Sequence, residues 1–304
     1  FKKQSMKKRN SSVNRTIHNF YLSKLKNPKI KKLYSRFKRI ILKDTDRNYC
    51  VAISGGPDSM ALAFLTKCMS IEEGTRNVYF HIDHKLRKES NKEALFLKKT
   101  LKKFGVNLSI LKWVKKQKIS NIQEQARLKR YELLFKKCKD YKLNKILTAH
   151  HKDDLHENFF IRLLRGSGLN GLISFKKKYS KLLINEKILI FRPLLIFSKH
   201  DLIYISKNTF GKYIKDPSNS YDKYLRVYVR KILSNLKFNK KNKNFDISLS
   251  NLDKSNEAIE YYIQKNIDKN VKKNDKKVII NKNFFSEPDE IVFRSLNSVL
   301  NSFS

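Results

Sequence analysis

Six consecutive residues, Ser-Gly-Gly-Pro-Asp-Ser from Ser54 to Ser59, have the composition of a phosphate-binding loop. They follow an apolar segment predicted to be a strand and precede a predicted helix. Gly55 and Gly56 allow the backbone to turn without a Cβ clash, so that successive N–H groups and both serine hydroxyls can face one anion. The helix N-terminus adds the positive end of its dipole. The loop therefore predicts a pyrophosphate site, and an ordinary tight turn is the alternative.

A second group of polar residues, at another predicted helix start, is suited to binding an amine. Asp154 and Glu157 are three residues apart and share one face of the helix, with His150 one turn before Asp154. Carboxylates in this position can bind an ammonium group and accept its proton. Acidic residues that simply favour the helix dipole are one alternative. A metal site at His150 and Asp154 is another, although the sequence has no HExxH pattern.

Two pairs of arginines are candidates for contacts with phosphate groups. Arg127 and Arg130 lie on one predicted helix, where arginines are more often solvated than catalytic. Arg226 and Arg230 are one turn apart on another helix and alternate with tyrosines. Cations for phosphates and rings for bases suit an RNA surface. An amphipathic helix with extended arginine side chains explains the second pair equally well.

The order of the predicted elements indicates an α/β protein. Short apolar segments predict strands at 49–53, 78–83, 107–111 and 145–149. Helical periodicity predicts intervening helices at 59–69, 90–104 and 123–141. Strands that alternate with helices form βαβ units. We therefore expect a doubly wound parallel sheet with a smaller, mainly helical C-terminal region.

Such a sheet brings residues from distant loops together, because ligands bind beyond the carboxyl ends of its strands. Ser54 follows the first predicted strand and His84 follows the second. His150 and His151 follow the fourth. We therefore expect three loops to meet in one crevice.

We divide the chain into three parts. Residues 1–48 hold sixteen Lys or Arg and two acidic residues, which predicts a flexible basic arm that leads into a helix. Residues 49–236 form the predicted catalytic region, with a core at 49–175 and a smaller helical part at 176–236. Residues 237–304 are predicted to be a polar linker and a partial helical tail.

Smaller elements are predicted in the second half of the chain, namely a hairpin around Asn185 and Glu186, helices near 198–208 and 222–236, and a single helix near 255–267 within the linker. Gly166, Gly168 and Gly171 spell GxGxxG, but they follow a helical pattern instead of a strand. We interpret them as a flexible loop. No GxxxxGK[ST] sequence is present, so a Walker-type site is not predicted.

The charge of the chain indicates a polyanionic partner. Its 304 residues hold 68 Lys or Arg and 27 Asp or Glu, a formal net charge of +41. An A/T-rich genome accounts for part of this excess through lysine codons. The remainder favours a nucleic acid and predicts steeply salt-dependent binding.

The cysteines and the hydropathy restrict the compartment. Cys50, Cys68 and Cys138 are widely separated, so neither a disulfide framework nor a metal cluster is predicted. No run approaches about 18 consecutive apolar residues and no secretory signal is recognisable, so we expect a cytoplasmic protein without a membrane partner. The chain begins with Phe1, which we interpret as a fragment, and an organelle is the alternative if a transit peptide was removed. The oligomeric state stays open.

Five stretches in a fixed order, covering roughly residues 49–236, resemble the tRNA(Ile)-lysidine synthetase family of N-type ATP pyrophosphatases. They are the Ser54–Ser59 loop, HIDHKLR at 81–87, QEQAR with the following RY at 123–131, TAHHKDD running on to RGSGL at 148–169, and RPLL at 192–195 with DPSN at 216–219. Asn158 and Val227 stand where threonine and asparagine are common in the family. Neither departure removes a group from the predicted centre. The C-terminal tRNA-binding module of longer members is not recognisable.

The resemblance implies a two-step reaction on tRNA. ATP with Mg²⁺ adenylates the C2 oxygen of the wobble cytidine in a tRNA(Ile) that carries a CAU anticodon, and pyrophosphate is released. The ε-amine of L-lysine then displaces AMP and gives lysidine. No DNA partner is expected.

The resemblance also implies roles for individual residues. The implied catalytic residues are Asp58, Arg127, His150, Asp154 and Glu157. The implied ATP-binding residues are Ser54, Gly55, Gly56, Pro57, Asp58, Ser59 and His84. The implied tRNA-binding residues are Arg130, Arg192, Arg226 and Arg230. A tRNA thiolase with the same loop and a non-catalytic RNA-binding protein are the alternative functions.

Overall fold

The computed structural model describes residues 15–85, 89–113, 122–175, 179–182, 185–214, 224–235, 243–274 and 277–302. Its contacts divide the chain into two compact units. The first unit comprises Phe1–Asn158 and Phe175–Val227, and the second comprises Phe159–Ser174 and Tyr228–Ser304. The divisions at Asn158, Ser174 and Val227 fall inside the region 49–236 that we predicted as one catalytic part.

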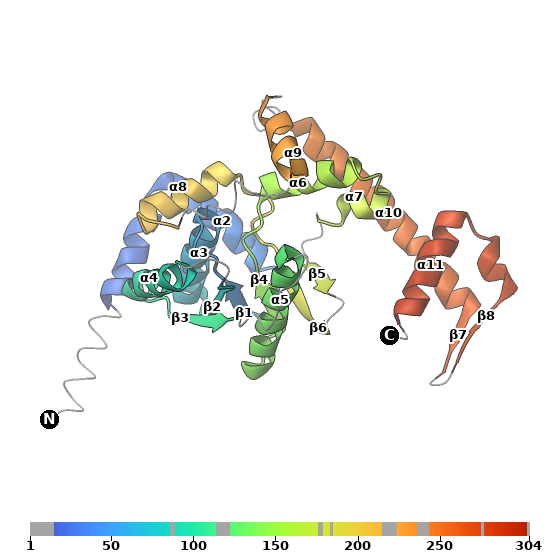
Figure 1. Cartoon of the computed structure of the whole chain (residues 1–304), viewed down its shortest axis with the longest axis horizontal. Helices are drawn as coiled ribbons and strands as arrows, with labels where there is room; N and C mark the ends of the chain where they lie inside the picture. Colours follow the sequence, from blue (N-terminus) through green and yellow to red (C-terminus); the bar gives the residue numbers. More distant parts are fainter. Residues whose placement is uncertain are drawn as a thin grey trace. The chain divides into compact units, whose positions relative to one another are not determined.

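The first unit contains a six-stranded sheet in the order β3-β2-β1-β4-β6-β5 (Figure 1). Its strands are β1 (Asn48–Ala52), β2 (Arg76–Asp83), β3 (Leu108–Lys112), β4 (Lys145–Leu147), β5 (Tyr179–Leu182) and β6 (Asn185–Phe191). All neighbours pair in parallel except β5, which pairs antiparallel to β6 and forms the edge. The structure confirms the predicted α/β fold and the hairpin, although Asn185 and Glu186 begin β6.

Helices precede, connect and follow these strands. They are α2 (Pro28–Ile41), α3 (Pro57–Glu73), α4 (Ser90–Lys103), α5 (Ile122–Asp140), α6 (Lys152–Leu163), α8 (Lys199–Thr209) and α9 (Tyr224–Asn235). Helix α3 begins two residues earlier than predicted because Pro57 occupies its first turn, where proline costs no hydrogen bond. Asp58 and Ser59 therefore belong to the first turn of α3.

Apolar cores lie on both faces of the sheet. The core that includes α2, α3, α4 and α8 takes Tyr49 and Val51 from β1. The core that includes α5 takes Cys50 from the same strand. Side chains alternate between the faces of a strand, so a strand covered on both sides is apolar at nearly every position. This arrangement is the reason why β1 reads as a continuous apolar run.

The basic N-terminal region is not a flexible arm throughout. Residues 15–25 are helical, and the Tyr21 hydroxyl donates a hydrogen bond to the Phe104 carbonyl over 3.0 Å. The Tyr21 ring also stacks on Phe64 with centroids 5.3 Å apart. The flexibility predicted for the arm is therefore wrong for residues 15–25, because aromatic side chains there complete the core, whereas the helix predicted to follow the arm is α2.

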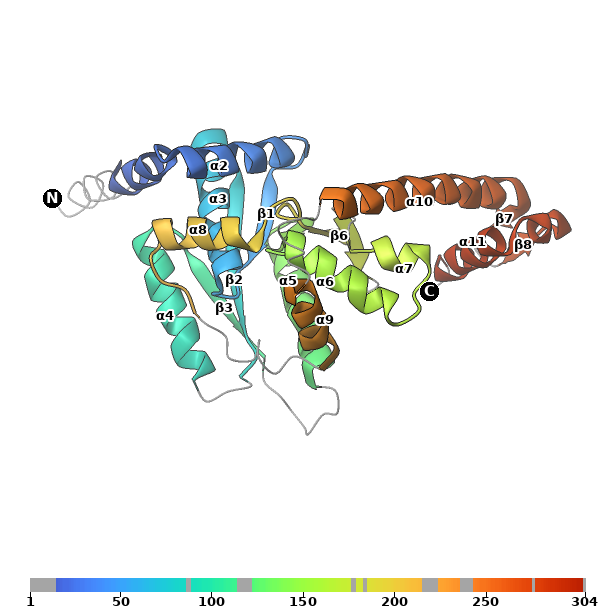
Figure 2. The same cartoon turned by 90° about the horizontal axis from the view of Figure 1, so that it is seen from above.

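The second unit is mainly helical. Its elements are α7 (Leu169–Ile173), α10 (Lys243–Asn270), β7 (Val271–Lys273), β8 (Val278–Ile280), the 3-10 helix η3 (Lys282–Ser286) and α11 (Asp289–Asn301). Figure 2 shows α10 as one long helix that leads into the β7–β8 hairpin, with α11 packed beside it. Of the GxGxxG segment that was predicted to be a loop, Gly166 to Gly168 precede α7, and Gly171 lies within this short helix.

Within the predicted polar linker, residues 243–270 form the single helix α10, of which the sequence predicted only the part near 255–267. Its packed side includes the asparagines Asn256, Asn266 and Asn270, all buried. The Asn266 amide donates to the Phe284 carbonyl over 3.2 Å and accepts from Asn270 over 2.8 Å. The prediction failed because asparagine is a poor helix former by itself, whereas here tertiary hydrogen bonds stabilise it.

Candidate active site

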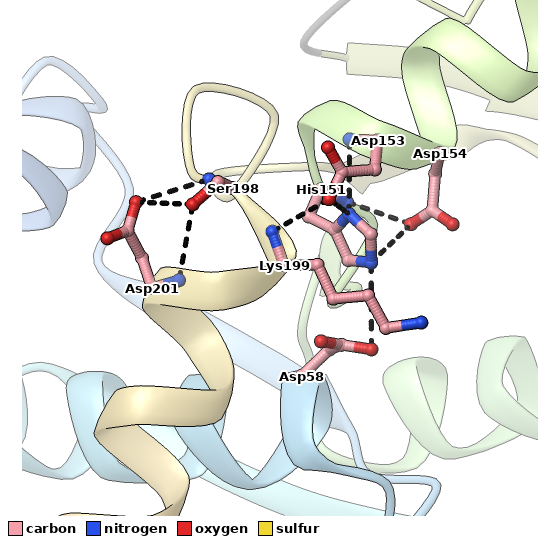
Figure 3. A network of polar contacts seen from close by, with 7 residues as sticks. All are labelled: Asp58, His151, Asp153, Asp154, Ser198, Lys199 and Asp201. Carbon is pink, nitrogen blue, oxygen red and sulfur yellow. Dashed lines mark hydrogen bonds and ion pairs between the residues drawn. The ribbon is translucent and has the colours of Figure 1, made fainter. Parts of the chain in front are cut away.

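Three helix N-termini meet beyond the carboxyl ends of β1 and β4, where the strand order reverses. Asp58 lies in the first turn of α3, Asp153 and Asp154 lie in the first turn of α6, and Lys199 begins α8. Figure 3 shows these side chains gathered around His151. Each N-terminus contributes the positive end of a helix dipole, although the first N–H groups of α6 and α8 already donate to Phe197, His151 and Asp153. The arrangement is suited to holding a polyphosphate.

The phosphate loop is braced by the Ser59 hydroxyl. It donates to the Gly56 carbonyl over 3.0 Å, and it accepts from the Gly55 N–H over 3.0 Å and from the Ser54 hydroxyl over 3.1 Å. Gly55 has a φ of +94°, a backbone conformation that favours glycine. Ser59 is buried and therefore fixes the loop from inside, and its predicted contact with phosphate stays a prediction.

The loop is also held by a residue that sequence reasoning did not select. The Ile214 N–H donates to the Gly55 carbonyl over 2.9 Å. A Cβ on Gly55 would lie 2.9 Å from the Ile214 Cδ1 atom. In a trans peptide the carbonyl and the next N–H point in opposite directions, so this bond directs the Gly56 N–H away from Ile214. No motif in the sequence signals this contact.

His151 is the second functional residue that the sequence did not single out. Its side chain is almost completely buried, and its Nε2 atom lies 3.7 Å from Asp58 Oδ2 and 3.5 Å from Asp154 Oδ2. Its Nδ1 atom accepts from the Asp153 N–H over 3.2 Å, so the ring proton belongs on Nε2 between the two carboxylates. His151, and not His150, therefore contacts Asp154. The HH pair was the available signal, but sequence gave no basis for choosing between its members.

Asp58 has an unusual electrostatic environment. Burial raises the pKa of its carboxyl group, and this effect is opposed by His151 and Lys199. Its buried Oδ1 atom has no hydrogen-bond partner among the described residues. A carboxylate oxygen kept in this state fits a role as a ligand of Mg²⁺ or as an acceptor for a bound nucleotide.

His150 turns toward a different group. Its Nδ1 atom lies 2.9 Å from the Thr148 hydroxyl, and its ring contacts Phe175 edge to face with centroids 5.1 Å apart. Burial lowers the pKa of His150 to about 4, so the ring is neutral at physiological pH. The Arg192 guanidinium covers the same Phe175 ring at 4.8 Å and is buried. The predicted tRNA-binding role of Arg192 stays a prediction, for a side chain that is buried beside His150.

Glu157 contacts one of the predicted RNA-binding residues. It is mostly buried on α6, and its Oε2 atom lies 3.9 Å from Arg226 Nε on α9. Glu157 follows Asp154 by three residues, so both carboxylates share a face of α6. Arg230, one turn further along α9, belongs to the second unit.

The arginines of α5 lie at the ends of other strands. Arg130 Nη2 lies 3.4 Å from His84 Nε2, which connects α5 to the loop after β2. Burial lowers the pKa of His84 to about 4, and the charge of Arg130 adds to this effect. Arg127 is exposed, with its guanidinium 5.9 Å from the Tyr131 ring centroid. The structure thus brings His84 and Arg130 together, as expected of neighbours at one sheet edge.

Part of the predicted motifs lies outside the described residues. These parts are positions 86–87 of HIDHKLR, the side chains of Gln123 and Glu124, and DPSN at 216–219. In the part of the chain that the structure describes, no group of three or more His, Cys, Asp or Glu residues is arranged to hold a metal ion. Likewise, none of the helices described combines the length and apolar character needed to cross a bilayer.

A doubly wound sheet with a Ser- and Gly-containing loop at its switch point defines an α/β protein of the phosphate-loop class. Residues 28–236 match the family model of the PP-loop domain, and the chain belongs to this family. The match begins at the first residue of α2, consistent with the place of that helix in the core. Family membership supports binding of ATP at the Ser54–Ser59 loop.

Curated relatives resemble the same part of the chain. The tRNA(Ile)-lysidine synthase of Orientia tsutsugamushi is 39% identical over 199 residues, which are 66% of this chain and 44% of the relative. The tRNA(Ile)-lysidine synthase of Wolbachia pipientis wMel is 42% identical over 185 residues, 60% of this chain and 42% of the relative. The chain therefore matches less than half of the length of these two relatives.

A solved structure supports the fold. The U34-tRNA thiolase of Methanococcus maripaludis with its [4Fe-4S] cluster superimposes with a TM-score of 0.62 at 16% identity and covers 74% of this chain and 78% of that chain. Similarity at this level of identity concerns the fold alone.

Proposed function

We propose that the chain acts as a tRNA(Ile)-lysidine synthetase with ATP, Mg²⁺ and L-lysine. One observation carries the proposal. Asp154, on the lysine-suited face of α6, and Asp58, in the phosphate loop, flank the same His151 Nε2 atom at 3.5 and 3.7 Å. Asp154, one of the two carboxylates suited to binding an amine, thus lies directly beside the phosphate loop.

In the first step, the C2 oxygen of the wobble cytidine attacks the α-phosphorus of ATP and pyrophosphate leaves. The N-termini of α3, α6 and α8 stabilise the charge on the leaving group. Asp58 would hold a Mg²⁺ ion bound with the nucleotide, and that ion would neutralise part of the phosphate charge. Arg127 and Arg130 supply further positive charge from α5.

In the second step, the ε-nitrogen of lysine forms a bond to C2, and the C2–O bond to AMP breaks. Asp154 and Glu157 bind the ammonium group, and the amine must lose a proton before it attacks. The Arg226 contact orients Glu157. Neutral His150 adjoins this region without adding a positive charge that would repel the substrate ammonium.

Buried cysteines argue against sulfur transfer. Cys50, Cys68 and Cys138 are all fully buried, and burial raises the pKa of the Cys50 thiol. Buried thiols with raised pKa values are poor nucleophiles. The tRNA substrate in this proposal is specifically tRNA(Ile) with a CAU anticodon. Because sulfur transfer is disfavoured, the second substrate is lysine and not a sulfur donor.

The direct test incubates the protein with ATP, labelled lysine and a CAU-anticodon tRNA(Ile) transcript. We expect equal amounts of AMP, pyrophosphate and a lysine-containing wobble nucleoside identified by its mass. The same transcript with uridine at the wobble position is the substrate control. Lack of a lysine-dependent adduct contradicts the proposal, and sulfur incorporation supports the thiolase alternative.

Asp154→Asn tests the amine site. We expect lysidine formation to fall by up to about a hundredfold, because loss of a charge-assisted contact costs up to about 3 kcal/mol. Filter retention of the tRNA is expected to change little. Asp268→Asn, which alters an exposed residue of α10, is the matched control. Equal activity of the two variants contradicts the assigned role of Asp154.

A further inference from the structure

The outer face of α2 carries an uncompensated positive charge. Residues 1–43 hold fifteen Lys or Arg and no Asp or Glu. The inner face of α2 is committed to the core through Ile30, Leu33, Tyr34, Phe37 and Ile41. Four cations on or just beyond the opposite face are exposed, namely Lys31, Lys32, Arg39 and Lys43. We call these four residues the basic face.

The residues of the basic face differ from other cations of α2 that serve the fold. Lys38 makes ion pairs with Glu72 and Glu73. Arg36 donates to the Ile196 carbonyl and covers the Phe197 ring. Lys32 and Arg39 lie seven residues apart and therefore on one side of the helix, about 10 Å apart along its axis at 1.5 Å per residue. Lys43 follows in the turn after the helix ends at Ile41, so the basic face continues past the helix end.

The composition of the chain does not account for this charge. Residues 243–304 are also rich in Lys and Asn, yet they hold ten Lys or Arg and nine Asp or Glu. A codon bias toward lysine acts on both regions, whereas compensation by acidic residues occurs in only one. Like charges near each other on a helix are destabilising. The basic face therefore has a cost for folding that packing does not explain.

The basic face also belongs to the same unit as the candidate active site and is connected to it. Arg36, on α2, is bonded to Ile196 at 3.0 Å. The segment that follows begins α8, and the Lys199 N–H donates to Asp153 Oδ2 over 2.9 Å at the site itself. Helix α2 therefore supports the segment that leads into the site, within the same unit.

We propose that the basic face of α2 binds the phosphate backbone of the RNA whose base is modified. This inference rests on the proposed function for the identity of that RNA. The contact is electrostatic and independent of sequence, so it supplies affinity and leaves the choice of base to the site.

The test replaces the four residues together, as Lys31→Gln, Lys32→Gln, Arg39→Gln and Lys43→Gln. Binding of the CAU transcript is measured at several salt concentrations without ATP or lysine. Each lost phosphate contact lowers the slope of log affinity against log salt by about 0.7 to 0.9. We expect the slope to fall by about three and the affinity to fall about 10- to 100-fold at physiological salt. At saturating tRNA, the rate of lysidine formation is expected to stay unchanged.

The matched control removes four exposed lysines of the second unit, by Lys254→Gln, Lys265→Gln, Lys269→Gln and Lys272→Gln. A smaller slope in the α2 variant than in this control supports the proposal. Equal slopes overturn it, and so does a loss of binding to phosphatidylserine vesicles with an unchanged RNA slope. The thermal unfolding midpoint of each variant is measured to confirm that it is folded. Removal of like charges is not expected to unfold α2.

The experiment separates this inference from the proposed function. A wild-type protein that forms lysidine while the α2 variant keeps the full salt slope overturns only the basic face. A wild-type protein that binds the transcript with the expected slope but makes no lysidine overturns only the proposed reaction.

Discussion

The two units use buried polar groups in opposite ways. In the second unit, the Asn266 amide has partners on both sides, donating to Phe284 and accepting from Asn270. In the first unit, Asp58 Oδ1 is buried without a hydrogen-bond partner among the described residues. Unsatisfied buried groups are costly and are retained where a ligand completes them. The satisfied group serves packing, and the unsatisfied one fits a ligand site because it lies in the phosphate loop beside His151.

The two units also differ in their content of histidine and cysteine. All seven histidines and all three cysteines of the sequence fall in the ranges of the first unit. Charge follows this division less sharply, because only residues 243–304 of the second unit are nearly neutral within a chain of net charge +41. The histidine and cysteine chemistry thus belongs to the first unit, and changes there should affect activity far more than changes in the second.

Gly55→Ala, in the first unit, is expected to cause the largest loss of activity. A side chain at a φ of +94° is strained, and its Cβ would also meet Ile214 at 2.9 Å. The loop must shift, and a displacement of about 1 Å at a reacting group costs about a hundredfold in rate. We expect ATP-dependent lysidine formation to fall by that factor. The measurement is the steady-state rate over a range of ATP concentrations.

Gly166→Ala is the matched control in the second unit. Gly166 has a φ of +69°, but no atom lies within 4 Å of an added Cβ. The substitution therefore introduces the backbone strain, about 1 to 2 kcal/mol, without the clash. Equal losses of activity in both variants contradict the view that Ile214 holds the loop in its working conformation.

The sequence predicted the sheet and the place of the site because both depend on local patterns. Apolar runs such as β1 and the SGGPDS loop are readable without tertiary information. The chain order of the elements then implies which loops converge. The residues at the centre of the site, including Asp58 and Asp154, could be named from their motifs alone.

Residues whose role depends on long-range contacts were missed. Only the structure shows that His151, and not His150, contacts Asp154. Ile214 contacts a loop about 160 residues earlier in the chain. The asparagines of α10 were read as linker residues because their partners lie on η3 and α11. Periodicity and composition contain no information on such partners.

Mild acid is expected to destabilise the first unit selectively. The pKa values of His84 and His150 are lowered from 6.5 to about 4, mainly by burial. Between these pH values the unfolded chain binds protons that the folded chain does not, so stability falls as the pH drops from about 6.5 to about 4. The slope is up to about 1.4 kcal/mol per pH unit for each histidine. Urea unfolding followed by fluorescence of Trp113, the only tryptophan, measures it.

Two substitutions sharpen this measurement. His150→Gln removes one of the titrating groups and is expected to make the pH dependence shallower. His18→Gln removes an exposed histidine and is expected to leave it unchanged. A pH dependence that is the same in both variants rules out His150 as a source of the acid sensitivity.

Asn266→Leu is expected to have the smallest effect on activity. It should lower only the stability of the second unit. The substitution leaves the Phe284 carbonyl and the Asn270 amide without their bonds to Asn266, at a cost of about 1 to 3 kcal/mol. The midpoint of unfolding by far-ultraviolet circular dichroism should fall, while the Trp113 fluorescence midpoint and lysidine formation stay constant. Trp113 is buried in the first unit and does not report on α10. If both midpoints shift together, the two units unfold as one. The units would then differ in the roles of their residues but would not have independent stabilities.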